Sequence, residues 1–297
     1  MKSNVTKKRL CWNIYLLLAL TPVIVSAGLA QYKVDGGSEW NKAESWVDEK
    51  VPTINDTAYF GFQMGTDPAK ISFTADAEAK NISGDSKGSE SITFDMNKHT
   101  LSLKNESKLN NNITVINGTW QATNQFVVSS GITFTVGRGA LIQATGSLNE
   151  VQVDSGGTLK IDGGRLEPKN GKRDISISSG GNLILAGSGS LEVRYVELDN
   201  DSTTTVILNN KGYENAPFQV NGNVNKLGKL VLKTGSDYNH KAGNKLVLIN
   251  YENRNRKDAE IEVAEFVNAK EGAIIKSEGH QFKINYHDES RITLTAI

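Results

Sequence analysis

Short segments in which apolar and polar residues alternate recur along the chain after residue 70. They occupy residues 71–73, 92–94, 101–103, 113–115, 132–136, 151–153, 159–161, 175–177, 183–185, 191–193 and 206–208, and Gly, Asn, Asp or Ser bounds each of them. Alternation with period two predicts β-strands, and the polar boundaries predict turns. Strands this short are unstable alone and have to stack on one another. The pattern therefore predicts an all-β fold.

A sequence repeat predicts how these strands are arranged. Residues 151–161 superimpose on residues 175–185 at a shift of 24, which places Val153 on Ile177 and Leu159 on Leu183. A weaker copy precedes them, in which Val128 aligns with Val153 at a shift of 25. Repeats of this length, with glycines at fixed corners, predict a right-handed parallel β-helix whose inward apolar residues stack from coil to coil. The alternative is an antiparallel β-sandwich, which also has short strands and glycine turns.

The pattern divides the chain into four parts. Residues 1–30 form a signal peptide, 31–69 an N-terminal cap with the first strands, and 70–216 the solenoid rungs. Residues 217–297 lose the repeat and contain longer alternating segments at 227–233, 245–251, 281–286 and 291–297. Because the last rung of a solenoid exposes an apolar face and an unpaired edge, we interpret residues 217–297 as a β-rich C-terminal cap.

The segment 1–30 has the three parts of a secretory leader. Four basic residues come first, an apolar run follows from Leu16, and small residues close the segment. This order predicts a signal peptide, with cleavage after Ala27 or after Ala30. The alternative is a membrane anchor, but Pro22 interrupts the apolar run, which is short for a membrane span. We expect an extracellular or cell-surface protein, with the periplasm as an alternative location, and no transmembrane segment in the mature chain.

Charge and cysteine content narrow the function classes. The whole chain has 33 basic and 33 acidic residues, and the leader removes four basic ones, so the mature chain carries a net charge of −4. It has no electrostatic reason to bind nucleic acid or an anionic membrane. The only cysteine, Cys11, lies in the leader, so we expect neither disulfides nor thiolate chemistry in the mature protein. No motif indicates a cofactor.

The start of the mature chain carries a more specific pattern. Trp40, Trp46 and Pro52 are followed by Asp56-Thr-Ala-Tyr-Phe60. This opening resembles that of secreted bacterial β-helix proteins related to autotransporter passengers, which are abundant in planctomycete-like and verrucomicrobial-like bacteria. Residues 91–103, 242–251, 278–286 and 291–295 extend the resemblance over most of the mature chain. The sequence departs from those proteins in carrying neither a C-terminal translocator barrel nor a Pro-Glu-Pro sorting motif, so the resemblance implies an architecture rather than an activity.

Two groups of residues are candidate ligand contacts. Trp46 and Trp120 are aromatic platforms for sugar rings if they are exposed. The alternative for Trp46, together with Trp40, is a plug over the first rung, and this is the interpretation that we favour. A basic cluster in the loop between two rungs, near Asp154, Asp162 and Asp174, is the best candidate for polysaccharide-lyase chemistry; it consists of Arg165, Lys169, Lys172 and Arg173. An ordinary solvated loop explains the same charges.

Other polar groups give weaker signals. Two carboxylate pairs lie in turn-like contexts, Asp199 with Asp201 and Asp288 with Glu289. The preference of Asp for turns explains their presence without a catalytic role. The four histidines are scattered, and His280 and His287 bracket a predicted strand, so we expect no shared metal. We therefore expect a structural or adhesive surface protein that binds extracellular polysaccharide or cell-surface components weakly. The alternatives are a β-helix polysaccharide lyase or glycoside hydrolase, and a self-assembling matrix or surface-layer component. The sequence leaves the oligomeric state open.

Overall fold

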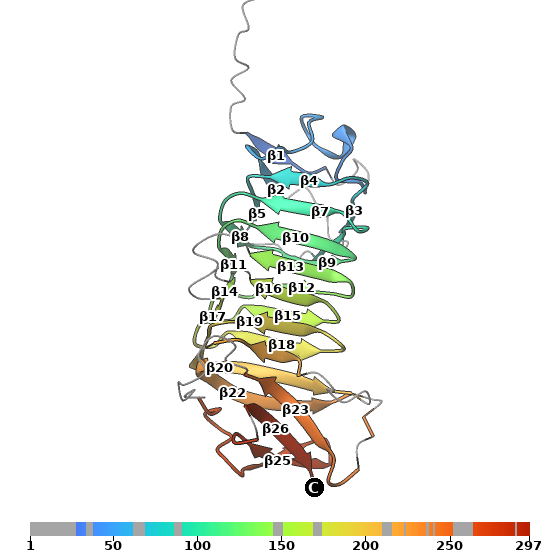
Figure 1. The fold of residues 1–297 in the computed structure, drawn as a ribbon. Helices are drawn as coiled ribbons and strands as arrows, with labels where there is room; N and C mark the ends of the chain where they lie inside the picture. The colour runs from blue at the N-terminus through green and yellow to red at the C-terminus, as the bar shows by residue number, and fades with distance from the viewer. Residues whose placement is uncertain are drawn as a thin grey trace, which may run out of the picture.

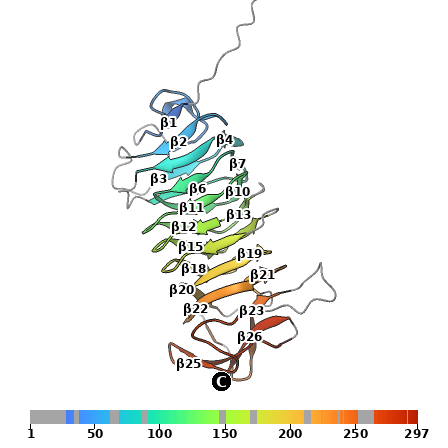
Figure 2. The same ribbon diagram turned by 90° about the vertical axis from the view of Figure 1, so that its left-hand side faces the viewer.

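The computed structural model describes most of the chain from residue 28 onward. The described residues are 28–33, 38–61, 69–85, 91–144, 151–168, 174–209, 216–222, 224–235, 238–239, 241–251, 264–288 and 290–297. They form an all-β solenoid of about seven turns, in which parallel coils stack along one axis. Figures 1 and 2 show this stack running from β2 near the N-terminal end to β25 at the C-terminal end. The parallel β-solenoid expected from the repeat is confirmed, whereas its right-handed winding stays a prediction.

Each coil contributes one strand to each of three faces. The first face contains β3 (Ala69–Ser72), β6 (Ser91–Asp95), β9 (Asn112–Ile116), β12 (Thr133–Val136), β15 (Thr158–Asp162) and β18 (Asn182–Ala186), followed by the second halves of β20 (Val196–Leu208) and β22 (Val224–Thr234). All pairings between these strands are parallel.

The second face follows the same order. It contains β4 (Ala77–Ala79), β7 (Thr100–Leu103), β10 (Gly118–Ala122), β13 (Ala140–Ala144), β16 (Arg165–Pro168), β19 (Ser190–Val193), β21 (Phe218–Val220) and β23 (Lys245–Asn250).

The third face is built from the remaining strand of each coil. It contains β8 (Ser107–Leu109), β11 (Phe126–Val128), β14 (Val151–Val153), β17 (Ile175–Ile177) and the first halves of β20 and β22. A small sheet of β1 (Leu29–Gln31), β2 (Thr57–Phe60) and β5 (Asn81–Gly84) lies next to β8. The Ser107 hydroxyl of β8 accepts the N–H of Ile82 in β5 at 3.1 Å and links the two.

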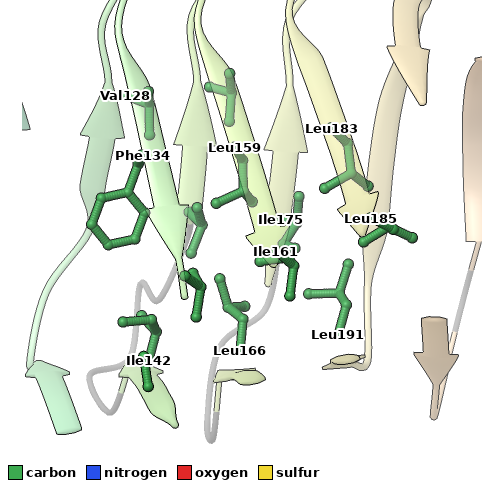
Figure 3. Close-up of a cluster of buried hydrophobic side chains, with 14 of the residues drawn as sticks. Val128, Phe134, Ile142, Leu159, Ile161, Leu166, Ile175, Leu183, Leu185 and Leu191 are labelled. Atoms are coloured by element: carbon green, nitrogen blue, oxygen red, sulfur yellow. The ribbon is translucent and has the colours of Figure 1, made fainter. Parts of the chain in front are cut away.

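Inward side chains form continuous columns because equivalent residues of successive coils are register partners. Val153 pairs with both Val128 and Ile177, and Leu159 pairs with Leu183, as the repeat predicts. On the second face one column runs Leu101, Trp120, Ile142, Leu166, Leu191, Phe218 and Ile249. Figure 3 shows Phe134, Leu159 and Leu183 on neighbouring strands of the core. Stacking of this kind buries apolar surface from every strand, which the short strands need for stability.

Glycines stack at one corner of the coils. Gly156 and Gly180 both have φ of 78°, in the left-handed region that glycine enters at little cost. The N–H of Gly156 donates to the carbonyl of Gly180 at 3.0 Å. The paired glycines of the repeat therefore mark turns that have the same shape in successive coils.

The two tryptophans of the opening pattern lie at the N-terminal end of the core. Trp40 and Trp46 are both completely buried, with ring centroids 5.0 Å apart. Trp40 stacks on Phe73 at 5.1 Å and meets the edge of Phe94 at 6.0 Å. They are packed against the first coils, as the plug hypothesis requires.

The chain changes pairing direction near its C-terminal end. β21 and β22 continue the parallel coils past residue 216, and β23 still pairs in parallel with β21. From there the pairing is antiparallel, in the order β23, β26 (Arg291–Ala296), β25 (His280–Asn285) and β24 (Ile274–Ser277). The first part of the region interpreted as a cap is therefore built as further coil.

Side chains cover the outer edge of β22. Asn268 accepts the N–H of Leu230 at 2.8 Å and donates its own amide to the Leu230 carbonyl at 2.9 Å. The Ser277 hydroxyl donates to the Leu232 carbonyl at 2.8 Å, and Glu278 accepts the N–H of Thr234 at 3.0 Å. These side chains form the hydrogen bonds that a further strand of the sheet would otherwise form with β22.

Candidate functional site

The two tryptophans expected as sugar platforms have no exposed surface. Trp46 and Trp120 are each 0% exposed. The indole N–H of Trp46 donates to the Trp40 carbonyl at 2.9 Å, and Trp120 lies between Phe94 and Phe134 with ring centroids 5.9 Å and 5.5 Å away. Both were candidates because tryptophan serves cores and binding surfaces equally well, and in this fold both point inward. Neither can stack on a ligand in this structure, so the prediction of these two residues as ligand contacts is wrong.

Arg165 lies on the outer surface of β16 and is neutralised by its neighbours. Its guanidinium contacts the carboxylates of Glu192, at 2.5 Å, and Glu167. The hydrogen bond that Arg165 donates to Glu192 is the main reason why the pKa of Arg165 is raised above its ordinary value. Lys169, Lys172 and Arg173 lie outside the described residues, so Arg165 is the member of the basic cluster that the structure places.

The three aspartates near that cluster in sequence do not converge. Asp154 follows β14, whereas Asp174 precedes β17, the next strand on the same face. Asp154 and Asp174 are therefore offset by four residues along the strand direction, which corresponds to about 13 Å. Asp162 lies at the end of β15 on another face and forms an ion pair with Lys160 at 2.6 Å. A shared acid–base centre requires groups that reach one substrate bond. Asp174 is completely buried, whereas Asp154 and Asp162 lie on different faces, so the three cannot act on one bond.

The remaining acidic pairs have structural partners. Asp199 and Asp201 lie at an irregularity of β20, where Lys226 approaches Asp199 at 3.5 Å and Lys229 approaches Asp201 at 2.9 Å. Asp288 binds Lys245 at 3.2 Å, while Glu289 lies outside the described residues. His280 begins β25 and His287 follows its end. Nowhere in the described ranges do three or more His, Cys, Asp or Glu side chains gather as metal ligands would.

The first face carries a regular array of hydroxyl and amide groups, which we call the threonine face. Its first outward column runs Ser91, Asn112, Thr133, Thr158, Asn182 and Thr203, and its second contains Thr93, Thr114, Thr135 and Lys160. Neighbouring strands are about 4.8 Å apart, and alternate residues along a strand are about 6.6 Å apart. The array is therefore a two-dimensional lattice of polar groups with nearly constant spacing.

The second column of the threonine face is available for binding. Thr93, Thr114 and Thr135 are partly exposed, and within the described part of the chain their hydroxyls form no hydrogen bond to another protein group. A threonine hydroxyl both donates and accepts, so each of the three offers both functions to a ligand.

Two lysines of the threonine face are paired with carboxylates of the protein. Lys70 lies 3.1 Å from Asp95, and Lys160 lies 2.6 Å from Asp162. Partial burial of Asp95 disfavours its charged form, but hydrogen bonds from Asn117 and Lys70 outweigh this and hold the pKa of that carboxyl below its usual range. The face thus presents neutral hydrogen-bonding groups between two ion pairs.

The array has a different sequence spacing from the repeat that predicts the solenoid. Ser91, Asn112 and Thr133 follow one another at a shift of 21, and so do Thr93, Thr114 and Thr135, whereas the repeat that was recognised has shifts of 24 and 25. The recurring triplets Ser-Ile-Thr, Asn-Ile-Thr and Thr-Phe-Thr are the signal that locates the face.

Comparison with protein-family models, curated proteins and solved structures found no match. The resemblance to autotransporter-like β-helix proteins therefore stays a prediction. Within the described ranges, no helix has the length and apolar character needed to span a membrane.

Proposed function

We propose that this protein is an exported β-solenoid that acts outside the cell by binding a neutral polysaccharide along the threonine face, without catalysis. The observation that carries the proposal is the lattice of free hydroxyls formed by Thr93, Thr114 and Thr135 beside the Ser91–Thr158 column. Export is inferred from the basic, apolar and small-residue order of the segment 1–30.

The regularity of the face suits a regular ligand. A polysaccharide repeats its hydroxyl groups along its length, and a lattice of donors and acceptors can match several of them at once. Each exposed hydrogen bond contributes little net free energy because it replaces a bond to water. Affinity therefore comes from the number of simultaneous contacts, and weak binding that strengthens with polymer length is expected.

The charge pattern favours a neutral polymer over an acidic one. An acidic polysaccharide needs unpaired cations, and Lys70 and Lys160 each have a carboxylate within hydrogen-bond distance. On the neighbouring face, Arg165 is likewise paired.

The two alternatives from the sequence have less support. A lyase or hydrolase needs convergent acid and base groups, and Asp154, Asp162 and Asp174, the aspartates near the basic cluster in sequence, do not converge. Assembly by end-to-end strand pairing needs an open edge, and the edge of β22 is hydrogen-bonded to Asn268, Ser277 and Glu278.

A retention assay on a polysaccharide panel tests the proposal. The panel contains neutral polymers (cellulose, xylan, mixed-linkage glucan) and acidic ones (pectate, alginate), and each incubation is also analysed for reducing and unsaturated ends. We expect retention on at least one neutral polymer with no ends released. Retention on no polymer overturns the binding proposal, retention confined to acidic polymers overturns its ligand class, and release of ends overturns the non-catalytic part.

A matched pair of variants locates the binding face. The triple variant Thr93→Val, Thr114→Val, Thr135→Val removes only hydroxyls from outward strand positions, and valine keeps the β propensity. We expect at least about a tenfold loss of affinity, from three lost contacts of about 0.5 kcal/mol each. The control Thr100→Val, Thr119→Val makes the same exchange at outward positions of the second face. Equal loss in both variants would show that the threonine face is not the site.

A further inference from the structure

β1 is an integral part of the fold. It pairs in parallel with β2, so that Ala30 lies against Ala58 and is 8% exposed. The carbonyl of Gln31 accepts the N–H of Val47 at 2.8 Å. Cleavage of the leader after Ala30 would remove Leu29 and Ala30 from this strand and uncover the buried side of β2.

Gly28 is also held in place, by hydrogen bonds at both of its backbone ends. Its carbonyl accepts the N–H of Thr57 at 2.9 Å, and its nitrogen donates to the Asp56 carboxylate at 3.1 Å. These two bonds anchor Gly28 to the start of β2, directly before the register pairs that begin at Leu29.

The Asp56 carboxylate is a buried anion surrounded by donors. Its side chain is 2% exposed, and it accepts the N–H of Thr53 at 3.0 Å and the Thr53 hydroxyl at 2.6 Å. Lys50, which is half exposed, approaches it at 3.3 Å. A buried carboxylate needs compensating charge as well as hydrogen bonds, and a second cation at the Gly28 nitrogen would lie in direct contact with it.

We infer that the mature protein begins at Gly28, and that the α-ammonium group released there forms an ion pair with Asp56. A signal peptidase would add water across the Ala27–Gly28 peptide bond; the C–N bond breaks, Ala27 becomes a carboxylate, and the Gly28 nitrogen becomes an amine that takes up a proton at neutral pH. The same nitrogen that donates one N–H to Asp56 then carries a positive charge and three donors. The small residues before this bond suit such an enzyme, with Ala27 at the cut and Val25 two positions upstream.

This inference rests on the export that belongs to the proposed function, and its test separates the two. The full chain is expressed with its own leader in a bacterial host, and the exported protein is analysed by intact mass and N-terminal sequencing. A first residue of Gly28 is expected. A first residue of Gln31 overturns the inference while export stands, whereas a full-length chain retained in the cell overturns both.

A second measurement tests the ion pair itself. Amine labelling of the Gly28 α-amino group at pH 7.5 should be about threefold slower in the wild type than in Asp56→Asn, because a bound carboxylate keeps the amine protonated and unreactive. The control is Asp48→Asn, at an exposed aspartate nearby, which should label at the wild-type rate. Equal labelling rates in wild type and Asp56→Asn, with circular dichroism confirming that both are folded, would overturn the ion pair.

Discussion

Thr204 lies directly against Leu183 in the neighbouring coil, within a column that is otherwise apolar. On its other side it pairs with Leu230, and the column continues through Leu159 and Phe134. Thr204 is 1% exposed, and its hydroxyl has no hydrogen-bond partner in the described part of the chain. A buried hydroxyl without a partner loses its bonds to water and gains none in return.

We therefore expect Thr204→Val to stabilise the protein. Valine has nearly the same shape, so removing the hydroxyl should raise the free energy of unfolding by about 1–2 kcal/mol. Chemical denaturation measures this. Thr205→Val, at the next and outward-facing position, is the matched control and should change stability by less than about 0.5 kcal/mol. A destabilised Thr204→Val protein would mean that the hydroxyl has a partner, such as a buried water.

Asp174 gives the fold a pH dependence. It is fully buried, and desolvation raises the pKa of its carboxyl, although the backbone N–H groups of Arg194 and Tyr195 and the Arg194 guanidinium partly oppose this. The folded protein thus binds this proton more tightly than the unfolded chain does. As the pH rises above the ordinary aspartate pKa of about 4, ionisation of Asp174 lowers the free energy of unfolding. As the pH falls back through the raised pKa, Asp174 takes up its proton and this loss disappears.

The neutral variant Asp174→Asn should reveal this dependence. Its remaining oxygen can still accept the two N–H groups, so we expect a higher Tm than wild type at pH 7 and a difference that shrinks toward pH 4. Thermal melts across this range measure it, with Asp162→Asn at the surface as control. A difference that grows as the pH falls would contradict the raised pKa.

Asn268 should control whether the solenoid associates through its last coil. Asn268→Ala leaves the N–H and C=O of Leu230 without their side-chain partner, which should cost about 1–3 kcal/mol and expose an edge that can pair with another chain. Asn268→Asp keeps the acceptor and loses the donor, so we expect a smaller effect. Light scattering during incubation at 37 °C measures the association. Val267→Ala, at an exposed neighbouring position, is the control and should stay monodisperse to the same extent as wild type.

The sequence by itself determined the type of architecture. The sequence alone aligns Val153 with Ile177 and Leu159 with Leu183, because a solenoid repeats its inward pattern along the chain and glycines mark the turns where L-residues are strained. The alternating pattern also located β23, β25 and β26 of the C-terminal end, but it missed β24 and did not show how these strands pair.

Only the tertiary structure decided which residues share a surface. The spacing of the threonine columns changes from 21 residues between Ser91, Asn112 and Thr133 to 25 between Thr133 and Thr158, so the full columns are defined only once the strands are in register. Burial is likewise a property of the whole stack. The sequence allows Trp46 and Trp120 as sugar platforms, although it favours a plug for Trp46, and the structure buries both side chains. The contact between Gly28 and Asp56 joins two segments that no local pattern links, because the folding of β1 onto β2 is what brings the end of the leader to a buried carboxylate.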